Sequence, residues 1–400
     1  MKLISELSKE NSKYPFAILK APKALDSCWP TSSQEHILRV ALSDPGMAKH
    51  EWLEWNAQHS LEHDQIDIGS YRLLPLVYKN LLRSDITAPY LNILEGLYKR
   101  TWLENQIKLH AYSEVLRALE GAGINTLVLK GISIAIHYYS DLGARPMLDI
   151  DILIPKHSVF AAIKILSDCG WLATGDLNLN ADMLDGRHAC GFKNSTGLQL
   201  DLHWHVLHFC LNDHITNEFW DAAIPLKLNG LTTRALCPAD QLLHICTHGL
   251  MSNTVPPIRW IADSYLLIKT NEMQVDWNRL ANLTVRSNES LRMYSALFYL
   301  VQNFQLPISK EIINKLGSLK PTLAQKTLFS ILMAKSNFGV WGIAFFFYYH
   351  FLSNGRFKKT QYNPFAFIAY LRMVKGFQNS WQVYMWAFTK TAIRVRKLFQ

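Results

Sequence analysis

The stretch Leu148-Asp-Ile-Asp-Ile-Leu-Ile154 places two carboxylates inside an otherwise apolar segment. In a β-strand, residues two apart point to the same side, so Asp149 and Asp151 share one face while Leu148 and Ile150 take the other. Two like charges close together on a largely buried strand are costly unless a cation lies between them. Carboxylate oxygens typically hold one or two divalent cations, so the stretch predicts a metal site.

Composition limits the class of protein. The chain has 400 residues, of which 49% are hydrophobic, and this is enough for two or three folded domains. The six cysteines show no CxxC spacing, so we expect buried thiols rather than disulfides. The segment 1–8 contains an acid and too short an apolar run for a secretory signal, so we expect a cytoplasmic protein.

Positive charge is concentrated in the C-terminal part of the chain. Residues 312–400 contain 13 Lys and Arg and no acid, whereas residues 1–311 contain 28 basic and 32 acidic residues. Such a basic segment predicts an anionic partner, which can be phospholipid headgroups, nucleic acid or an acidic protein.

Helical patterns flank the acidic stretch on its N-terminal side. Apolar periodicity predicts helices over residues 32 to about 122. Ser32-Ser-Gln-Glu35 is interpreted as a capping box that opens the first helix, and Pro45 as its stop. Gly121 and Gly123 are expected to end the last of these helices.

From residue 124 the pattern predicts strands. Ile124 to Leu129 indicates a strand, followed by a turn at Lys130-Gly131 and a short helix that reaches about Tyr139. Segments 187–193 and 198–206, joined by the turn Asn194-Ser-Thr-Gly197, predict a hairpin whose second strand carries Asp201. Residues 238–304 return to helical periodicity.

Several motifs together resemble the uncharacterised nucleotidyltransferase family of the polymerase-beta-like superfamily. The resemblance covers about residues 35 to 300, and its motifs are Leu129-Lys-Gly131, Tyr138 and Tyr139, Arg145, Asp149-Ile-Asp151, Leu200-Asp-Leu-His-Trp204, His248 and Arg259-Trp-Ile-Ala-Asp263. The chain departs from the superfamily pattern because Ile132 follows Gly131, where Gly or Ser is usual, and 17 residues separate Gly131 from Asp149.

The resemblance implies an α+β fold with a small mixed-sheet nucleotidyltransferase core between N-terminal and C-terminal helical regions. We predict four parts: a helical region over 1–122, the α/β core over 123–236, a helical region over 237–320 and a basic, aromatic-rich helical tail over 321–400. The resemblance also implies that Asp149 and Asp151 hold the metals, that Asp201 is the third carboxylate, and that Gly131 opens the loop facing triphosphate.

The expected chemistry explains these residue types. Two Mg²⁺ ions held by carboxylates can clamp the entering and leaving groups when an acceptor attacks the α-phosphate of an NTP, with ATP the expected donor. A glycine lets backbone amides approach phosphate closely. The candidate nucleotide-binding residues are Lys130, Gly131, Arg145, Arg187 and Lys193, and the candidate substrate-binding residues are His203, His248 and Arg259.

Histidines allow a competing interpretation. His244 and His248 are spaced as two ligands on one helix face, and His203, His205 and His208 follow Asp201, which is compatible with a zinc hydrolase. The helix lacks the Glu of an HExxH motif, so packing or phosphate binding is the alternative. Walker, Rossmann and nucleophile-elbow motifs do not occur in the sequence, which disfavours those enzyme classes.

The tail contains a nearly continuous apolar run, Phe338 to Leu352, shorter than the roughly 20 residues that span a bilayer. Trp381, Trp386 and the basic end Arg394-Val-Arg-Lys397 suit helices that lie on anionic lipid. Alternatively, the aromatics cover the helical region and the lysines are solvated, or the tail contacts RNA.

The sequence thus predicts a Mg²⁺-dependent transfer of a nucleoside monophosphate to an unidentified acceptor, in the cytoplasm or at a membrane surface. The alternative is a nucleotide-binding or scaffold protein with a degenerate site and a membrane-surface tail. Titration of Mg²⁺ and ATP against wild type and Asp149→Ala discriminates the two.

Overall fold

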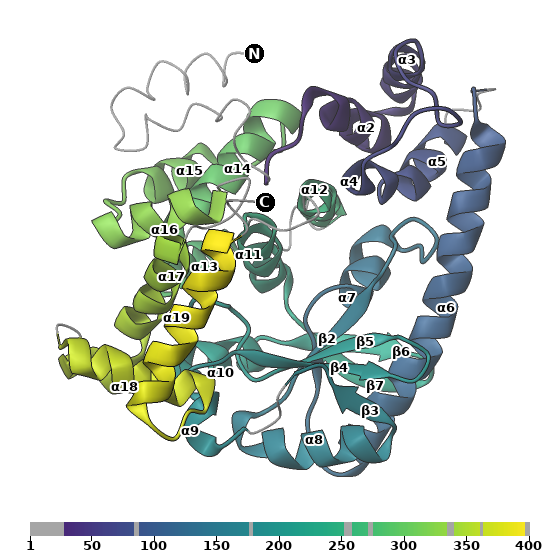
Figure 1. The fold of residues 1–400 in the computed structure, drawn as a ribbon. Helices are drawn as coiled ribbons and strands as arrows, with labels where there is room; N and C mark the ends of the chain where they lie inside the picture. The colour runs from purple at the N-terminus through teal and green to yellow at the C-terminus, as the bar shows by residue number, and fades with distance from the viewer. Residues whose placement is uncertain are drawn as a thin grey trace.

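The computed structural model describes residues 28–83, 88–175, 179–251, 258–270, 275–333, 340–360 and 363–396. It is a mixed α+β fold in which one seven-stranded sheet is surrounded by helices (Figure 1). The predicted fold class is therefore confirmed. The start of the apolar run at Phe338, Pro257 and the basic residue Lys397 lie outside the described residues.

Within residues 28–83 and 88–126, five helices precede the sheet. They are α2 (Ser32–Leu42), α3 (Pro45–Asn56), α4 (Ile68–Tyr71), α5 (Leu74–Leu82) and α6 (Leu91–Gly121). The capping box of α2 is formed by Thr31 and Gln34 rather than by Ser32 and Glu35, because the helix begins one residue earlier than expected. Pro45 begins α3, where its missing N–H has no helical partner to lose.

The sheet contains two hairpins and two parallel pairings. Its strands are β1 (Leu127–Val128), β2 (Asp149–Leu153), β3 (Trp171–Ala173), β4 (Ala189–Asn194), β5 (Gln199–His203), β6 (Ile224–Leu228) and β7 (Leu231–Ala235), in the order β3-β4-β5-β2-β1-β7-β6. Strand β2 is parallel to β5 and antiparallel to β1. The predicted hairpin is confirmed as β4 and β5. The predicted strand over 124–129 is shorter than expected, although the Leu129 amide still donates to the Asp151 carbonyl at 3.0 Å.

Short helices connect the strands. Between β1 and β2 lie α7 (Ile132–Ile134) and the π-helical turn η2 (Ala135–Tyr139), and later connections contain the 3₁₀ turn η3 (Lys156–Ser158), α8 (Val159–Asp168), α9 (Ala181–Leu184) and α10 (Asp213–Asp221). All six cysteines are free thiols, as predicted, although Cys169 is exposed.

Helices also form the C-terminal part. They are α11 (Pro238–Gly249), α12 (Arg259–Thr270), α13 (Trp277–Arg286), α14 (Ser290–Phe304), α15 (Lys310–Gly317), α16 (Leu323–Met333), α17 (Val340–Ser353), the 3₁₀ segment η4 (Gly355–Thr360), α18 (Pro364–Lys375) and α19 (Ser380–Arg396). The predicted part boundaries after residues 122, 236 and 320 coincide with gaps between elements, and the division into domains stays a prediction.

The two faces of the sheet belong to different cores. Ile150 and Ile152 pack with apolar residues of α6 and α8 in one buried cluster. The opposite face contributes Leu153 to a larger cluster that includes residues of α2, α3, α5 and α11 to α16. In Figure 1, α8 lies on one side of the sheet and α11 on the other. The alternation of β2 thus turns its apolar side chains to the first core and its acids toward α11. Leu148 is 49% exposed, contrary to expectation, because β2 begins only at Asp149.

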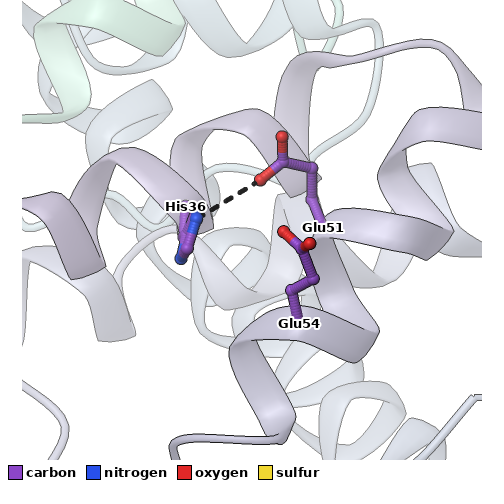
Figure 2. Close-up of side chains that lie close together, drawn as sticks. All are labelled: His36, Glu51 and Glu54. Atoms are coloured by element: carbon purple, nitrogen blue, oxygen red, sulfur yellow. Dashed lines mark ion pairs between the residues drawn. The ribbon is translucent and has the colours of Figure 1, made fainter.

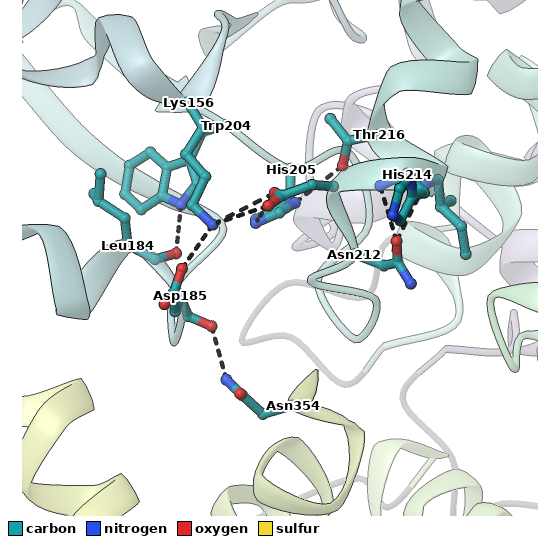
Figure 3. Close-up of polar contacts among 11 residues, drawn as sticks. Lys156, Leu184, Asp185, Trp204, His205, Asn212, His214, Thr216 and Asn354 are labelled. Atoms are coloured by element: carbon teal, nitrogen blue, oxygen red, sulfur yellow. Dashed lines mark hydrogen bonds and ion pairs between the residues drawn. The ribbon is translucent and has the colours of Figure 1, made fainter. Parts of the chain in front are cut away.

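The helices α17 to α19 pack on one another and on the sheet region. Phe351, Tyr370 and Val383 are members of a small buried cluster of their own. Asn354 donates from Nδ2 to the Asp185 carbonyl at 2.8 Å, and Asp185 also accepts from Lys156 Nζ at 2.7 Å (Figure 3). Much of the aromatic run therefore serves packing. Within the described part of the chain, none of the helices combines the length and apolarity needed to cross a bilayer.

Candidate active site

The acidic side chains meet across two parallel strands. Asp151 on β2 pairs in register with Asp201 on β5, and Asp149 pairs with Gln199. Because paired residues of neighbouring strands point to the same face, Asp149, Asp151 and Asp201 share the face that looks toward α11. The three carboxylates predicted to act together are therefore brought onto one surface.

Asp151 is the most enclosed of the three carboxylates. It is 0% exposed, and its Oδ1 lies 3.0 Å from Lys130 Nζ and 3.1 Å from His203 Nε2. Its other oxygen, Oδ2, is buried and has no hydrogen-bond partner among the described residues. Burial disfavours the charge, but Lys130 and His203 outweigh burial and hold the pKa of Asp151 well below its usual value. Asp151 is thus an ionised buried carboxylate with one unused oxygen.

Asp201 is half-buried beside a strand glycine. Burial and the neighbouring Asp151 charge raise the pKa of Asp201 above its usual value. Gly191 of β4 lies opposite it, and a Cβ there would come within 3.1 Å of Asp201 Oδ1 and 2.7 Å of Thr174 Oγ1. The glycine therefore leaves the space that the Asp201 carboxylate occupies. Sequence analysis did not select Gly191, although an isolated glycine within a strand pattern signals such close approach.

Asp149 faces a different environment, a cavity of about 170 Å³ rich in cationic side chains. The cavity is lined by charged and polar groups from several elements, among them Arg72, Lys130, Arg145, Asp149, His248 and Arg259. Burial, followed by the Asp151 charge, raises the pKa of Asp149. A half-buried carboxylate beside several cations suits a site for an anionic ligand that also carries a metal.

Gly131 lies in the turn that lines this cavity. Its φ of +63° is a conformation that L side chains rarely adopt, and a Cβ would lie 3.4 Å from the Asp149 carbonyl. The predicted tight turn after Lys130 is therefore present, and glycine is needed there for its backbone conformation.

Arg145 is held inside the protein. Its Nε and Nη2 each donate to the Asp263 carboxylate at 2.8 Å, and its Nη1 donates to the Gly131 carbonyl at 3.3 Å. Tyr139 Oη donates to the same carboxylate at 2.8 Å. Arg145 is only 4% exposed. Arg145 was predicted to contact triphosphate, but in the structure Asp263 accepts from the Nε and Nη2 edge of its guanidinium, and its Nη1 fixes the Gly131 turn.

Two other predicted cations lie away from the cavity. Arg187 donates from Nε and Nη2 to the Val374 carbonyl, at 3.2 and 2.9 Å, and thereby contacts α18. Lys193 is exposed at the turn end of β4, near Gly197. Neither residue lines the cavity beside Asp149. Their predicted role in balancing triphosphate is not supported by their positions, because Arg187 is turned toward α18 and Lys193 is exposed two strands away from Asp149.

Arg259 and Arg72 are the cationic residues that the fold brings to Asp149. Arg259, at the start of α12, donates to the Pro146 carbonyl at 2.7 Å and lines the cavity, and its substrate-binding role stays a prediction. Burial and the nearby Arg145 lower its pKa to about 10. Arg72 follows α4 and was missed, because no local pattern connects that helix with residues 77 positions later.

Helix α11 adds histidines to the other side of Lys130. His248 Nε2 lies 2.9 Å from Lys130 Nζ, and the Lys130 charge, followed by burial, holds the pKa of His248 well below its usual value. Burial and Lys130 lower the pKa of His244 to about 3. A second cavity, of about 130 Å³, lies here and is lined by Asp151, Asp201, His203 and neighbouring histidines. Lys130 separates this cavity from the one that contains Asp149.

Only two groups of three potential metal ligands occur among the described residues. The first is Asp151, Asp201 and His203, with ligand atoms within 4.8 Å of one another. Asp149 is not a member of that group. His244 and His248 are members of neither group, so the zinc interpretation of their spacing finds no third ligand in the described structure.

The second group lies in the N-terminal helices, where His36, Glu51 and Glu54 come together (Figure 2). His36 Nε2 is 3.7 Å from Glu51 Oε2, Arg39 Nη1 is 3.7 Å from Glu51 Oε1, and Glu54 pairs with His50 at 3.2 Å. Arg39 already accompanies Glu51, and His50 lies beside Glu54, so we interpret this group as a surface cluster of polar side chains.

His205 belongs to a separate network. Strand β5 ends at His203, and His205 Nδ1 lies 2.9 Å from Thr216 Oγ1 of α10 (Figure 3). The sequence alternation that would place His205 beside Asp201 fails, because the strand does not continue to it.

The chain was compared with known proteins. It matches the uncharacterised nucleotidyltransferase family over residues 70–305. Among solved structures, the antibiotic-resistance factor ANT(2'')-Ia is 13% identical, with 49% of this chain and 97% of that chain covered and a TM-score of 0.34. An antigenic nucleotidyltransferase-like protein from Paracoccidioides brasiliensis is 12% identical, with 57% and 96% covered and a TM-score of 0.30. No curated protein matches.

Proposed function

This chain belongs to the uncharacterised nucleotidyltransferase family, and we propose that it moves a nucleoside monophosphate from an NTP, with ATP the expected donor, to an acceptor hydroxyl. An acceptor oxygen attacks the α-phosphorus, the new O–P bond forms, and the bond to the β-phosphate breaks with release of pyrophosphate. The observation that carries the proposal is that Asp149, Asp151 and Asp201 share one sheet face beside a cavity rich in cations.

The residues present fit a divalent cation. Asp151 Oδ2 is buried without a hydrogen-bond partner among the described residues, and Asp201 lies directly across the strand pair. Asp149, Asp151 and Asp201 would hold Mg²⁺, with two ions expected. Bound there, Mg²⁺ would neutralise charge on the phosphates and on the attacking and leaving oxygens.

The remaining residues bind and orient the donor. Arg72 and Arg259, which line the same cavity as Asp149, offer cationic donors to the triphosphate. Gly131 lets the backbone approach phosphate without a side chain between them. Arg145 holds the Gly131 carbonyl and so keeps this turn in place. Asp201 is positioned to accept the proton of an acceptor hydroxyl on the side away from the arginines.

Calorimetric titration with ATP, with and without Mg²⁺, tests the proposal against Asp149→Ala. We expect Mg²⁺-dependent ATP binding by wild type, at least tenfold weaker binding by the variant, and pyrophosphate release when acceptors from a cell extract are added. Asp168→Ala, which removes an exposed carboxylate at the end of α8, is the matched control. Wild type that binds no ATP in the presence of Mg²⁺ would contradict the proposal.

A second candidate function is nucleotide binding without turnover, and one observation favours it. The Lys130 ammonium lies 3.0 Å from Asp151 and already compensates the charge that a cation would compensate. The same titration separates the two functions. ATP binding that does not depend on Mg²⁺, with no pyrophosphate release for any acceptor fraction, would favour the binding protein.

A further inference from the structure

We propose that His203 is a direct ligand in the Asp151–Asp201 site, which makes it a mixed carboxylate and imidazole site that binds Mn²⁺ more tightly than Mg²⁺. This inference rests on the proposed function, because it names the cation of the same site. It differs from the predicted set of three carboxylates, in which His203 had only a substrate-binding role.

The strand register places His203 where a ligand is needed. It is the second residue after Asp201 on β5, so both side chains point to the same face, and it pairs in register with Leu153 of β2. Its Nε2 lies 3.1 Å from Asp151 Oδ1. Two ligand atoms on adjacent corners of an octahedron of radius about 2.1 Å lie roughly 3 Å apart, so the observed separation fits two ligands of one cation.

Burial strengthens the assignment. His203 is 6% exposed and Asp151 is 0% exposed. The second carboxylate oxygen of Asp151, Oδ2, is buried and has no hydrogen-bond partner among the described residues. Buried polar atoms are rarely left without partners, so this oxygen, on the side chain that His203 Nε2 contacts, indicates a ligand at this position.

The Lys130 side chain can move away from Asp151 when a cation binds there. Its Nζ lies 3.0 Å from Asp151 Oδ1 but also 2.9 Å from His248 Nε2. A cation bound to Asp151 would repel this ammonium, and His248 would still accept its hydrogen bond. The side chain therefore keeps a partner when a metal takes its place beside Asp151.

The ligand types decide the metal preference. Carboxylates alone suit Mg²⁺, whereas an imidazole nitrogen favours divalent ions of the first transition row. Asp149, on the arginine-lined side, remains available for a cation that accompanies the triphosphate. The two sides of the carboxylate face would then hold different kinds of cation.

Pulsed EPR of Mn²⁺ bound to the full chain tests this directly. We expect nitrogen modulation from a coordinated imidazole in wild type, and a change to the ¹⁵N pattern when histidine is ¹⁵N-labelled. His203→Gln should lose the modulation and bind Mn²⁺ at least tenfold more weakly, while its affinity for Mg²⁺ changes less than threefold. His188→Gln, a histidine that lines the same cavity outside the ligand group, is the control and should keep the signal.

The outcomes separate this inference from the proposed function. Bound Mn²⁺ without histidine modulation in labelled wild type overturns the inference and leaves nucleotidyl transfer intact. Absence of any Mn²⁺ binding also overturns it. Histidine modulation without pyrophosphate release in any acceptor fraction supports the inference and counts against turnover. Because the labelling experiment uses wild type, the result does not depend on whether His203→Gln folds.

A different observation carries a second proposal, at the surface of α19. Trp381, Tyr384, Met385 and Phe388 are 61%, 58%, 53% and 70% exposed. Their spacing of three and four residues places them along one side of the helix. Phe365 at the start of α18 is also 78% exposed. Large apolar side chains gathered on one exposed helix face mark an interaction surface.

We infer that this face lies on an anionic membrane surface. Residues 312–400 contain 13 basic residues and no acid, which matches anionic headgroups. Trp and Tyr prefer the membrane interface, and a helix of this kind lies along the surface without crossing it.

Sedimentation with vesicles of phosphatidylcholine, with and without phosphatidylserine, tests the second proposal with the full chain. We expect sedimentation with phosphatidylserine vesicles that falls at high salt, and at least a fivefold loss in the double variant Trp381→Ser and Phe388→Ser. Leu172→Ser, which removes a side chain 69% exposed on β3, is the matched control. No sedimentation, or equal sedimentation of wild type and double variant, overturns the proposal, as does binding to RNA alone.

Discussion

Asp149 and Asp151 lie two residues apart on one face of the same strand, yet their surroundings differ. Asp151 is completely buried between Lys130 and His203, and its pKa is held well below the usual value. Asp149 is half-buried at a cavity lined by arginines, and burial raises its pKa. Two residues of the same type on one strand thus have different surroundings, because different elements pack above them. We expect Asp151 to bind a metal ion, and Asp149 to bind a cation that also contacts the triphosphate.

The largest expected difference between the two acids is in stability. Asp151→Asn leaves the buried Lys130 charge without its partner, so the free energy of unfolding should fall by about 3 kcal/mol. This loss is near the lower end of the range for broken buried ion pairs, because the Lys130 side chain keeps some exposure. Asp149→Asn should change it by less than about 1 kcal/mol. Urea unfolding at pH 7 without added metal measures both, and equal losses would show that the two environments are equivalent.

The next effect concerns the arginines on the Asp149 side. Arg145→Lys cannot keep both hydrogen bonds to Asp263, so the free energy of unfolding should fall by about 2 kcal/mol. Arg259→Gln should instead weaken ATP affinity about tenfold with little change in stability. Unfolding curves and calorimetric ATP titrations of both variants test this division. If Arg145→Lys remained as stable as wild type, its role as the clamp of the Gly131 turn would be refuted.

A smaller effect is expected on the side of Asp201. In Gly191→Ala the new Cβ crowds Asp201 Oδ1 and Thr174 Oγ1, which should cost about 1 kcal/mol of stability and weaken Mn²⁺ binding severalfold. Gly175→Ala is the control, because a Cβ there meets no atom within 4 Å. Mn²⁺ titration followed by EPR gives the affinity. Similar affinities in the two alanine variants would mean that Asp201 does not need the space beside Gly191.

The smallest expected effect is a difference in pH dependence. Because the pKa of Asp149 is raised in the folded state, its contribution to stability is present below the unfolded pKa and is lost as pH rises through the folded pKa. Asp149→Asn should therefore be slightly more stable than wild type at pH 7, with the difference vanishing below about pH 4. The lowered pKa of Asp151 gives the opposite sign, with its contribution lost only as pH falls below the usual Asp range. Unfolding curves between pH 3 and 7 distinguish the two, and the same slope for both variants would contradict the comparison.

Much of the local structure could be predicted from the sequence. The acidic strand, the β4–β5 hairpin with Asp201, the turn at Gly131 and the end of the long helix α6 all follow from alternation and turn residues that act within a few positions. Boundaries were less accurate, as the capping box at Thr31 and the short strand β1 illustrate. Neighbouring elements decide where a helix or strand ends, and a local pattern does not contain them.

The cationic residues around the site were predicted less well. Arg145 was predicted to bind the nucleotide, but a carboxylate 118 residues later holds it. Arg187 instead contacts α18, and Lys193 is exposed two strands away from Asp149. No local sequence pattern around Arg72 indicates that it lies near the carboxylates. A positive charge is recognisable in a sequence, but the anion that it meets depends on packing between distant elements.

The sequence by itself determined the side of the sheet on which the carboxylates lie, because strand alternation leaves Asp149, Asp151 and Asp201 no other arrangement once the two strands pair. Only the tertiary structure decided their partners. The parallel register of β2 and β5 puts Asp151 beside Asp201 and His203, and α11 and α12 bring His248 and Arg259 over the same face. Periodicity acts over two to four residues, whereas charge compensation in a buried site acts through space, between residues as far apart in the chain as Asp151 and His203, 52 positions.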